Sequence, residues 1–360
     1  MKRGVTMRAW SDFSRRLSAV RRLRSGLRGW GGVGAMAIVC ALAIAFVLLL
    51  PLTQSRGEGG AELGGQRTVQ GVQAKAPKCN DDTIQDQSPP PSDDEGAAIK
   101  AIKEHGVLKV GVDQNSYRWG YRNPNSSSSD LEGFDIDLVT AIAKNIFGSS
   151  YTPDKVQMLA IPTDQRIPAI QGKRVDMVVR TMTITCLRAD DVAFSAPYFV
   201  TGQQVLAPKS SKISGYNDSL AHQRVCSAAT STANTRLAAD KGNKIPASVD
   251  VLPAVPNQLD CLVKLQLGEA DAVVTDGALA ASQAAQDPTV ELKGSPFTTE
   301  YYGVAMNKGA TDLVQRVNRI LETYRTSTGP DGWHASYTKW LLPTLGKDST
   351  SANPPTPHYK

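Results

Sequence analysis

The sequence predicts an α/β fold of two lobes, preceded by an N-terminal transmembrane helix. Three observations support this prediction. Strand and helix patterns alternate from residue 97 to about 200, a second and similar pass begins near Arg224, and an uncharged apolar run fills residues 34–50. Because alternating strands and helices assemble into open parallel sheets with helices on their faces, each pass predicts one lobe. The 360 residues and 41% hydrophobic content suffice for two cores.

The N-terminal residues predict a membrane anchor. The apolar run, extended by Pro51 and Leu52, is long enough to cross a bilayer core of about 30 Å. Residues 1–32 form a basic flank, whose first 30 residues hold nine Lys or Arg and one acidic residue. Since basic flanks stay on the cytoplasmic side of a membrane, we expect residues 1–32 to be cytoplasmic and residues 33–52 to span the membrane.

Lipid attachment at Cys40 is the alternative to an uncleaved signal-anchor. The residues before it, Ile38 and Val39, are bulky for lipoprotein processing, and the apolar run continues for ten residues beyond the cysteine. We therefore favour a single-pass anchor in the cell membrane, with the folded part on the extracytoplasmic side.

Net charge and motifs exclude several function classes. The formal charge of +6 belongs to the N-terminal flank, because the remaining 330 residues sum to −2. A nucleic-acid-binding domain needs a basic face that neutralises phosphates, so we expect no nucleic-acid partner. Hydrolase, nucleotide, zinc and calcium motifs are missing from the sequence, and its four histidines are scattered. We therefore expect no catalytic residue, metal or cofactor.

The other four cysteines, Cys79, Cys186, Cys226 and Cys261, lie in the part expected outside the cell, where thiols usually oxidise. Four cysteines allow three pairings. Cys226 and Cys261 lie in one compact region, which favours their pairing and leaves Cys79 for Cys186. The spacings lack the paired cysteines of a zinc site, so disulfides are the preferred interpretation.

Two segments have too little apolar periodicity to bury a core. Residues 53–96 are rich in Gly, Gln and Ser and carry three prolines at 89–91. Residues 346–360 are polar and also contain proline. This composition predicts a disordered linker and a disordered tail.

The first pass has recognisable elements. Residues 97–106 show helical spacing and end at Gly106, residues 107–113 read as a buried strand that ends in Asp113, and residues 133–148 place four apolar side chains on one stripe. Further along the chain we expect a strand over 155–161, a short helix and then the strand VDMVV.

The second pass repeats the pattern. From Arg224 we expect the strand RVCSA, the helix TANTRLAADKG, the strand SVDVLPAV, the helix NQLDCLVKLQLGEA and the strand DAVVTD. Residues 301–308 are strand-like, and residues 311–325 form an amphipathic helix.

Several segments together resemble the polar amino acid family of periplasmic binding proteins, solute-binding protein family 3, especially the actinobacterial glutamate and glutamine binders. The segments are, in the family's order, GFDIDLVTAIA, RIPAIQGKRVDMVVRTMTITCLRADDVAFSAPYF, RVCSAATST, GEADAVVTD and YYGVAMNK. The resemblance covers about residues 97–345. It implies the type II fold, with lobe 1 over 97–200 and 297–345, lobe 2 over 205–292, and two crossing hinge strands.

A bound amino acid needs both of its charges paired once it leaves water. Arg188 follows a strand end, where open α/β sheets place ligands, and its guanidinium can hold a carboxylate through two parallel bonds. The resemblance implies that Arg188 binds the α-carboxylate, with Thr181 and Thr183 beside it, and that Asp276 binds the ammonium. Thr230 and Ser231 lie between a strand and a helix, where backbone N–H groups attract anions.

The ligand's side chain is expected near the loop after the first strand. The resemblance places the side-chain contacts there, and the loop offers Asp113, Arg118, Tyr121 and Arg122. Two arginines favour a carboxylate, and thus glutamate or aspartate over glutamine or asparagine.

The resemblance implies a monomeric solute-binding protein that closes on an amino acid and docks on the permease and ATPase subunits of an ABC importer. One alternative is an amino-acid sensor that signals to a membrane receptor or kinase pathway. A further alternative is an enzyme similar to cyclohexadienyl dehydratase, which would need an additional acid–base group in the cleft.

Overall fold

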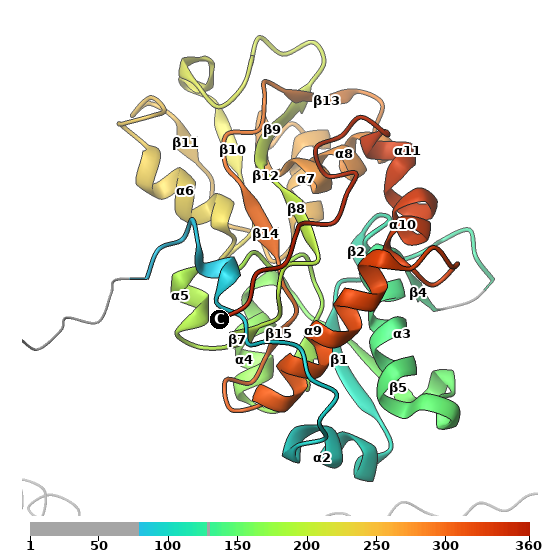
Figure 1. Cartoon of the computed structure of the whole chain (residues 1–360). Helices are drawn as coiled ribbons and strands as arrows, with labels where there is room; N and C mark the ends of the chain where they lie inside the picture. Colours follow the sequence, from blue (N-terminus) through green and yellow to red (C-terminus); the bar gives the residue numbers. More distant parts are fainter. Residues whose placement is uncertain (1–78, 128–129) are drawn as a thin grey trace, which may run out of the picture. The chain divides into compact units, whose positions relative to one another are not determined.

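The computed structural model describes residues 79–127 and 130–360 (Figure 1). The predicted basic segment 1–32, the anchor 33–52, Cys40 and the linker up to residue 78 lie outside these residues. Within the described part of the chain, no helix combines the length and the apolar character needed to cross a bilayer.

Lobe 1 contains a five-stranded sheet in the order β5-β1-β6-β15-β7. The strands are β5 (Val156–Ala160), β1 (Leu108–Val112), β6 (Met177–Val178), β15 (Ala305–Met306) and β7 (Ala193–Phe194). β1 pairs in parallel with β5 and β6, whereas β15 is antiparallel to both of its neighbours. The parallel arrangement expected of the first pass is present in β1, β5 and β6, and the sheet is mixed because β15 enters lobe 1 as the chain returns from lobe 2.

Lobe 2 contains a second sheet in the order β11-β10-β12-β9-β13. The strands are β11 (Asp250–Val251), β10 (Arg224–Cys226), β12 (Ala272–Asp276), β9 (Gln203–Pro208) and β13 (Val290–Lys293). The first three are mutually parallel, and β9 and β13 add an antiparallel pair. β9 and β13 carry the chain into and out of this lobe.

Two short strands connect the lobes. β8 (Phe199–Thr201) leads from β7 to β9, and β14 (Glu300–Tyr302) leads from β13 to β15. They pair antiparallel with each other at the centre of the view in Figure 1. The structure thus has two crossing strands between its sheets, as expected of the type II fold, and the predicted strand over 301–308 is divided into β14 and β15.

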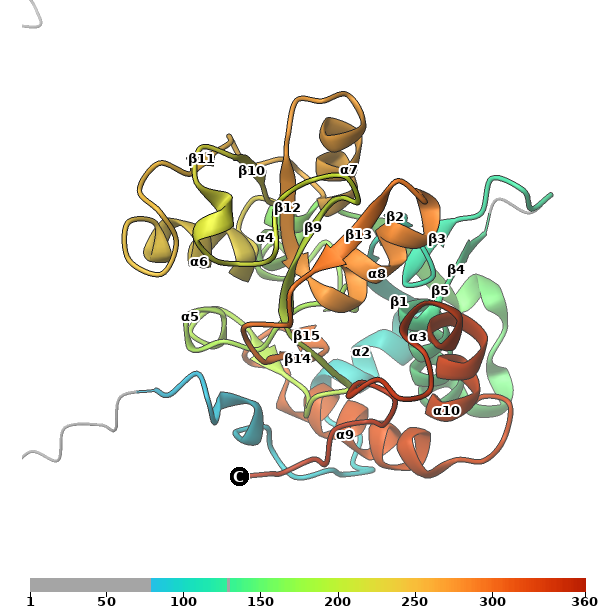
Figure 2. The same cartoon turned by 90° about the horizontal axis from the view of Figure 1, so that it is seen from above.

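Helices cover both sheets (Figure 2). Lobe 1 has α2 (Ala97–His105), α3 (Phe134–Phe147), α4 (Arg166–Gln171), α5 (Cys186–Ala189), α9 (Thr311–Thr326), α10 (Trp333–Ser336), a π-helix (Tyr337–Leu341) and α11 (Leu342–Leu345). Lobe 2 has α6 (Thr232–Asp240), α7 (Gln258–Gln266) and α8 (Gly277–Gln286). A small sheet of β2 (Asn115–Ser116), β3 (Gly120–Arg122) and β4 (Leu131–Glu132) completes lobe 1.

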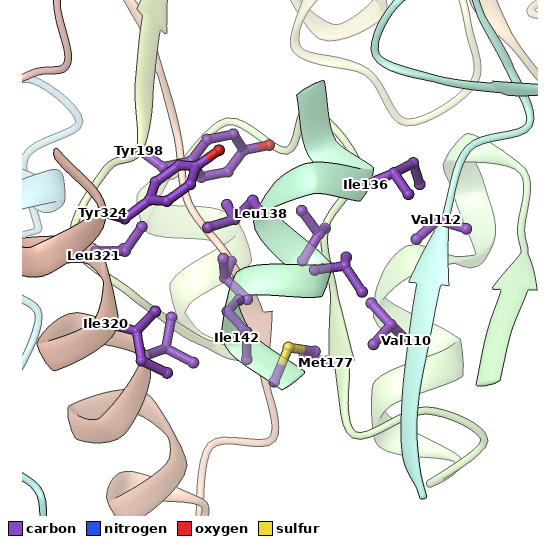
Figure 3. Close-up of a cluster of buried hydrophobic side chains, with 14 of the residues drawn as sticks. Val110, Val112, Ile136, Leu138, Ile142, Met177, Tyr198, Ile320, Leu321 and Tyr324 are labelled. Carbon is purple, nitrogen blue, oxygen red and sulfur yellow. The ribbon is translucent and has the colours of Figure 1, made fainter. Parts of the chain in front are cut away.

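The helix predictions over 97–106, 133–148 and 311–325 are confirmed. α2 ends at Gly106, whose positive φ of 71° closes the helix without a Cβ penalty. Figure 3 shows α3 between β1 and α9. Leu138 and Ile142 of α3 lie in the same buried cluster as side chains of β1 and α9. The apolar stripe of α3 therefore joins the sheet to the C-terminal helix.

Both disulfides favoured by the sequence are present. Cys79 pairs with Cys186, 107 residues away, and Cys226 pairs with Cys261, 35 residues away. Cross-links of this span stabilise a fold by roughly 3–5 kcal/mol in the chain-entropy account.

The disorder predicted for residues 79–96 and 346–360 is wrong. Ser88 Oγ donates to the carbonyl oxygen of Phe194 (2.9 Å) and accepts from Asn318 Nδ2 (2.7 Å). The backbone N–H of Lys360 donates to the carbonyl oxygen of Ser88 (3.0 Å), so the two segments lie side by side on lobe 1. Their order comes from backbone and polar contacts and from a disulfide, which composition alone does not reveal.

Truncating the centre of α3 should destabilise lobe 1. Leu138 is fully buried, so Leu138→Ala should lower the free energy of unfolding by about 2–5 kcal/mol through lost burial and a cavity. Leu267 is 67% exposed, and Leu267→Ala should change it by less than about 0.5 kcal/mol. Urea unfolding followed by circular dichroism measures both, and equal losses would contradict the assigned core.

Candidate functional site

A polar cavity lies where the carboxyl ends of the parallel strands of the two sheets meet. Residues of both lobes line it. Lobe 1 contributes Thr163, Arg166, Arg180, Thr181, Thr183 and Arg188, and lobe 2 contributes Ala228, Ser231, Thr232, Ala233, Gln258, Thr275, Asp276 and Leu279. Strand ends of open α/β sheets are the usual ligand sites of such folds.

Arg188 lies on the short helix α5 and is buried. Its Nη1 donates to the carbonyl oxygen of Thr183 (2.7 Å), and its Nη2 donates to that of Thr230 (3.0 Å), which belongs to lobe 2. Burial lowers the pKa of the Arg188 guanidinium, and the charges of Glu300 and Asp276 oppose this shift. Because guanidinium carries five N–H donors, Arg188 can fix the adjoining loops and still donate to an anion.

Asp276 ends β12 and faces the same cavity from lobe 2. The hydroxyl of Tyr302 donates to Asp276 Oδ2 at 2.5 Å. Burial and the neighbouring charge of Glu300 raise the pKa of Asp276 to about 7, although Tyr302, Arg188 and Arg166 act in the opposite direction. This carboxylate would gain a partner from a cation in the cavity.

Two threonines beside the cavity have strained backbones. Thr181 has a φ of 41° and Thr230 a φ of 55°, a region that β-branched residues rarely adopt. The Thr181 N–H donates to Asp135 Oδ2 (3.1 Å), and the Thr230 carbonyl accepts from Arg188. Such strain concentrates at functional sites, where surrounding contacts hold it in place.

Ser231 begins α6 as its N-cap. Its Oγ accepts from the N–H of Asn234 (3.0 Å) and donates to the carbonyl oxygen of Ala228 (2.7 Å). The neighbouring Thr232 donates to Glu300 Oε2 (3.0 Å) on the crossing strand β14. The loop before α6 therefore lies against the cavity, as the sequence predicted, with the Ser231 hydroxyl occupied by capping.

Two cavity arginines were not predicted from the sequence. Arg180, 1% exposed, forms an ion pair with Asp113 (2.9 Å) and donates to Asn257 Oδ1 of lobe 2 (2.9 Å). Arg166 donates through Nε to the carbonyl oxygen of Thr163 (3.0 Å). Burial and the charges of Arg188 and Arg180 lower its pKa well below the usual value. Within residues 79–127 and 130–360, no carboxylate forms an ion pair with Arg166.

Sequence signals for these two arginines differ. Arg180 directly follows the strand VDMVV, so its place at a strand end could have been noticed. Arg166 begins a helix, where an arginine is ordinarily solvated, and only the packing of α4 beneath the cavity places it there.

The residues after β1 that were predicted to bind the ligand's side chain lie mostly outside the cavity. Arg118 donates to the carbonyl oxygen of Trp340 (3.1 Å), Tyr121 donates to Glu132 Oε1 (2.7 Å), and Arg122 is exposed on β3. None of the three lines the cavity, because Arg118 and Tyr121 are held by other parts of lobe 1 and Arg122 lies on the surface. Asp113 lies immediately behind the cavity, engaged by Arg180.

Contacts beside the cavity join the two lobes directly. Gln258 Nε2 donates to Asp113 Oδ2 (3.3 Å) and to the hydroxyl of Ser116. The N–H of Thr163 donates to the carbonyl oxygen of Pro256 (3.0 Å). Water could replace these polar contacts if the lobes moved apart, whereas Ala278 and Leu279 of α8 pack with the buried apolar cluster of lobe 1.

Two α/β lobes, two crossing strands and a polar cavity between the lobes define a solute-binding protein. Residues 108–343 match the family of bacterial extracellular solute-binding proteins, family 3. The chain belongs to this family.

Relatives of known name are binding proteins for amino acids. The ABC transporter glutamine-binding protein GlnH of Bacillus subtilis is 33% identical over 246 residues, which cover 68% of this chain and 84% of that protein. The glutamate-binding protein GluB of Corynebacterium efficiens is 29% identical over 275 residues, covering 73% and 86%. The solved solute receptor for L-cysteine of Neisseria gonorrhoeae has a TM-score of 0.63 at 26% identity, covering 72% of this chain and all of that one.

Removing Asp113 should leave a buried charge without its partner. Asp113→Ala should lower the free energy of unfolding by about 3–5 kcal/mol, because Arg180 stays buried without a carboxylate. Asp94 is exposed, so Asp94→Ala is a matched control that should change stability by less than about 0.5 kcal/mol. If denaturant titration finds the two variants equally stable, the ion pair of Arg180 with Asp113 does not contribute to the stability of the fold.

Proposed function

We propose that this chain is the extracytoplasmic, membrane-anchored binding component of an ABC importer and that it captures an acidic amino acid, with glutamate preferred. The observation that carries this proposal is the cluster of Arg188, Asp276 and Arg166 around one cavity. An acidic amino acid has three charged groups, and each of these three side chains can pair with one of them.

The two charges common to all amino acids have candidate partners. Arg188 from lobe 1 can donate to the α-carboxylate, and Asp276 from lobe 2 can accept from the ammonium. The two side chains are close enough for each charge to shift the pKa of the other. A ligand held in this way contacts both lobes, so binding would favour the closed arrangement by its differential affinity.

Arg166 supports an acidic ligand over its amide. Three guanidinium groups line the cavity. Asp276 is the carboxylate in its lining, Asp113 behind it is occupied by Arg180, and buried Glu300 beside it acts on Arg188. A ligand with a second carboxylate would neutralise Arg166, whereas a neutral amide would leave that cation unpaired. Since an unpaired buried charge is costly, we propose glutamate or aspartate as the ligand class, although the Bacillus subtilis relative is named for glutamine.

Location and partners follow from sequence and names together. The basic flank and apolar run before residue 53 support an anchor with the lobes outside the cell. The word ABC transporter in a relative's name supports permease and ATPase subunits as partners. We expect a monomer, as one chain supplies both sides of the cavity.

Calorimetry on the full chain with glutamate, aspartate, glutamine and asparagine tests the proposal. We expect one glutamate per chain, and Arg188→Ala should weaken binding at least about 30-fold through loss of a buried charge-assisted pair. Arg122 lies on the exposed side of β3, so Arg122→Ala should leave affinity unchanged. If the Arg188 variant bound glutamate as tightly as the unmodified chain, the assigned binding site would be wrong.

Arg166→Gln should change selectivity more than it changes stability. We expect glutamate affinity to fall by about 10–100-fold, the usual range for one charge-assisted hydrogen bond, while glutamine affinity changes by less than about threefold. The ratio of the two dissociation constants is the readout. A parallel loss for both ligands would remove Arg166 from side-chain selection.

Affinity should rise with pH through the titration of Asp276. Only the ionised carboxylate can accept from the ligand's ammonium, and its pKa without ligand is about 7. Below that pH the ligand must displace a proton, so affinity should fall by up to about tenfold per pH unit toward pH 5.5. Asp276→Asn should bind weakly and with a flat profile, whereas a flat profile in the unmodified chain would contradict this role.

A further inference from the structure

The N-terminal strap, defined as residues 79–88, is attached to the helix that carries Arg188. Cys79 forms its disulfide with Cys186, the first residue of α5. Asp81 Oδ1 accepts from the N–H of Cys186 at 2.7 Å. A covalent bond and a hydrogen bond thus meet at Cys186, two residues before Arg188.

α5 has few other means of keeping its position. It is a single turn of four residues, shorter than a helix that is stable by itself. Its Leu187 is 73% exposed, so apolar burial within the turn contributes little to holding it, although Ile184 before it and Val192 after it are buried. Thr185 caps the turn by accepting from the N–H of Arg188 (3.3 Å), and Lys308 Nζ donates to the carbonyl oxygen of Asp190 (2.9 Å).

The strap itself is fixed to lobe 1. Ile84 packs against the buried cluster beside α4 and β7, and Gln85 is buried. Ser88 bonds to the carbonyl oxygen of Phe194 and to Asn318. The strap therefore links α5 to the packed core of lobe 1 and can restrict its movement.

We propose that the Cys79–Cys186 disulfide and Asp81 are positioning elements of the anion-binding arginine: they hold α5 so that the Arg188 guanidinium stays aimed between Thr183 and Thr230. This inference rests on the proposed function. Without the strap, α5 would have to be ordered when the ligand binds, and ordering even one residue costs about 1–2 kcal/mol. That cost corresponds to roughly a tenfold loss of affinity.

Glutamate calorimetry and amide hydrogen exchange on the full chain test the proposal together. The double variant Cys79→Ser with Cys186→Ser avoids a free thiol, and we expect it to bind glutamate about tenfold more weakly. Faster exchange should be confined to residues 183–191. Asp81→Ala should weaken binding in the same direction, and Asp81→Asn, which keeps the acceptor oxygen, should restore it.

Asp94→Ala is the control, because Asp94 is exposed and lies outside the strap. It should leave both glutamate affinity and exchange in residues 183–191 unchanged. Unchanged affinity in the double cysteine variant would overturn the proposal, as would faster exchange spread over both lobes. If the unmodified chain bound no glutamate, the proposed function would fail, while exchange at α5 would still show whether the strap holds the helix.

Discussion

The structure depends on the burial of charged groups between two lobes. Guanidinium groups of Arg166, Arg180 and Arg188 lie in lobe 1, and Asp276 approaches from lobe 2. Each costs several kcal/mol to remove from water unless it is paired. Asp113 pairs one arginine within lobe 1, and the others donate to backbone carbonyls. Buried Glu300 on β14 also acts on Arg188, so Arg166 is the arginine whose charge a small zwitterion with an additional carboxylate would neutralise.

The ligand's charges can be paired from both sides only when the two lobes close around it. β8 and β14 are the crossings that join the sheets, so each lobe can carry its own part of the site. Polar contacts between the lobes run through Gln258 and the carbonyl of Thr230, and water can replace them. Ala278 and Leu279 of α8 add apolar packing against the buried cluster of lobe 1. A ligand that contacts a cation of one lobe and an anion of the other therefore adds charge pairing that stabilises the closed arrangement.

Local pattern predicted the parts of this fold that have one solvated and one buried face. α3 and α9 show a clear 3.6-residue stripe, whereas α8 is buried on most sides and gave no such signal. The family resemblance pointed to Arg188 and Asp276, which the structure brings to one cavity. Arg166 could not be found in this way, because its burial depends on how α4 packs. Loop position likewise misled the prediction for Arg118, which the small sheet turns toward Trp340.

The most direct test is a crystal structure of the chain grown with glutamate. The account predicts that the α-carboxylate contacts the Arg188 guanidinium, the ammonium contacts Asp276, and the side-chain carboxylate approaches Arg166. Glutamate bound elsewhere, or bound here with its ammonium away from Asp276, would contradict the assignment of one charge to each lobe.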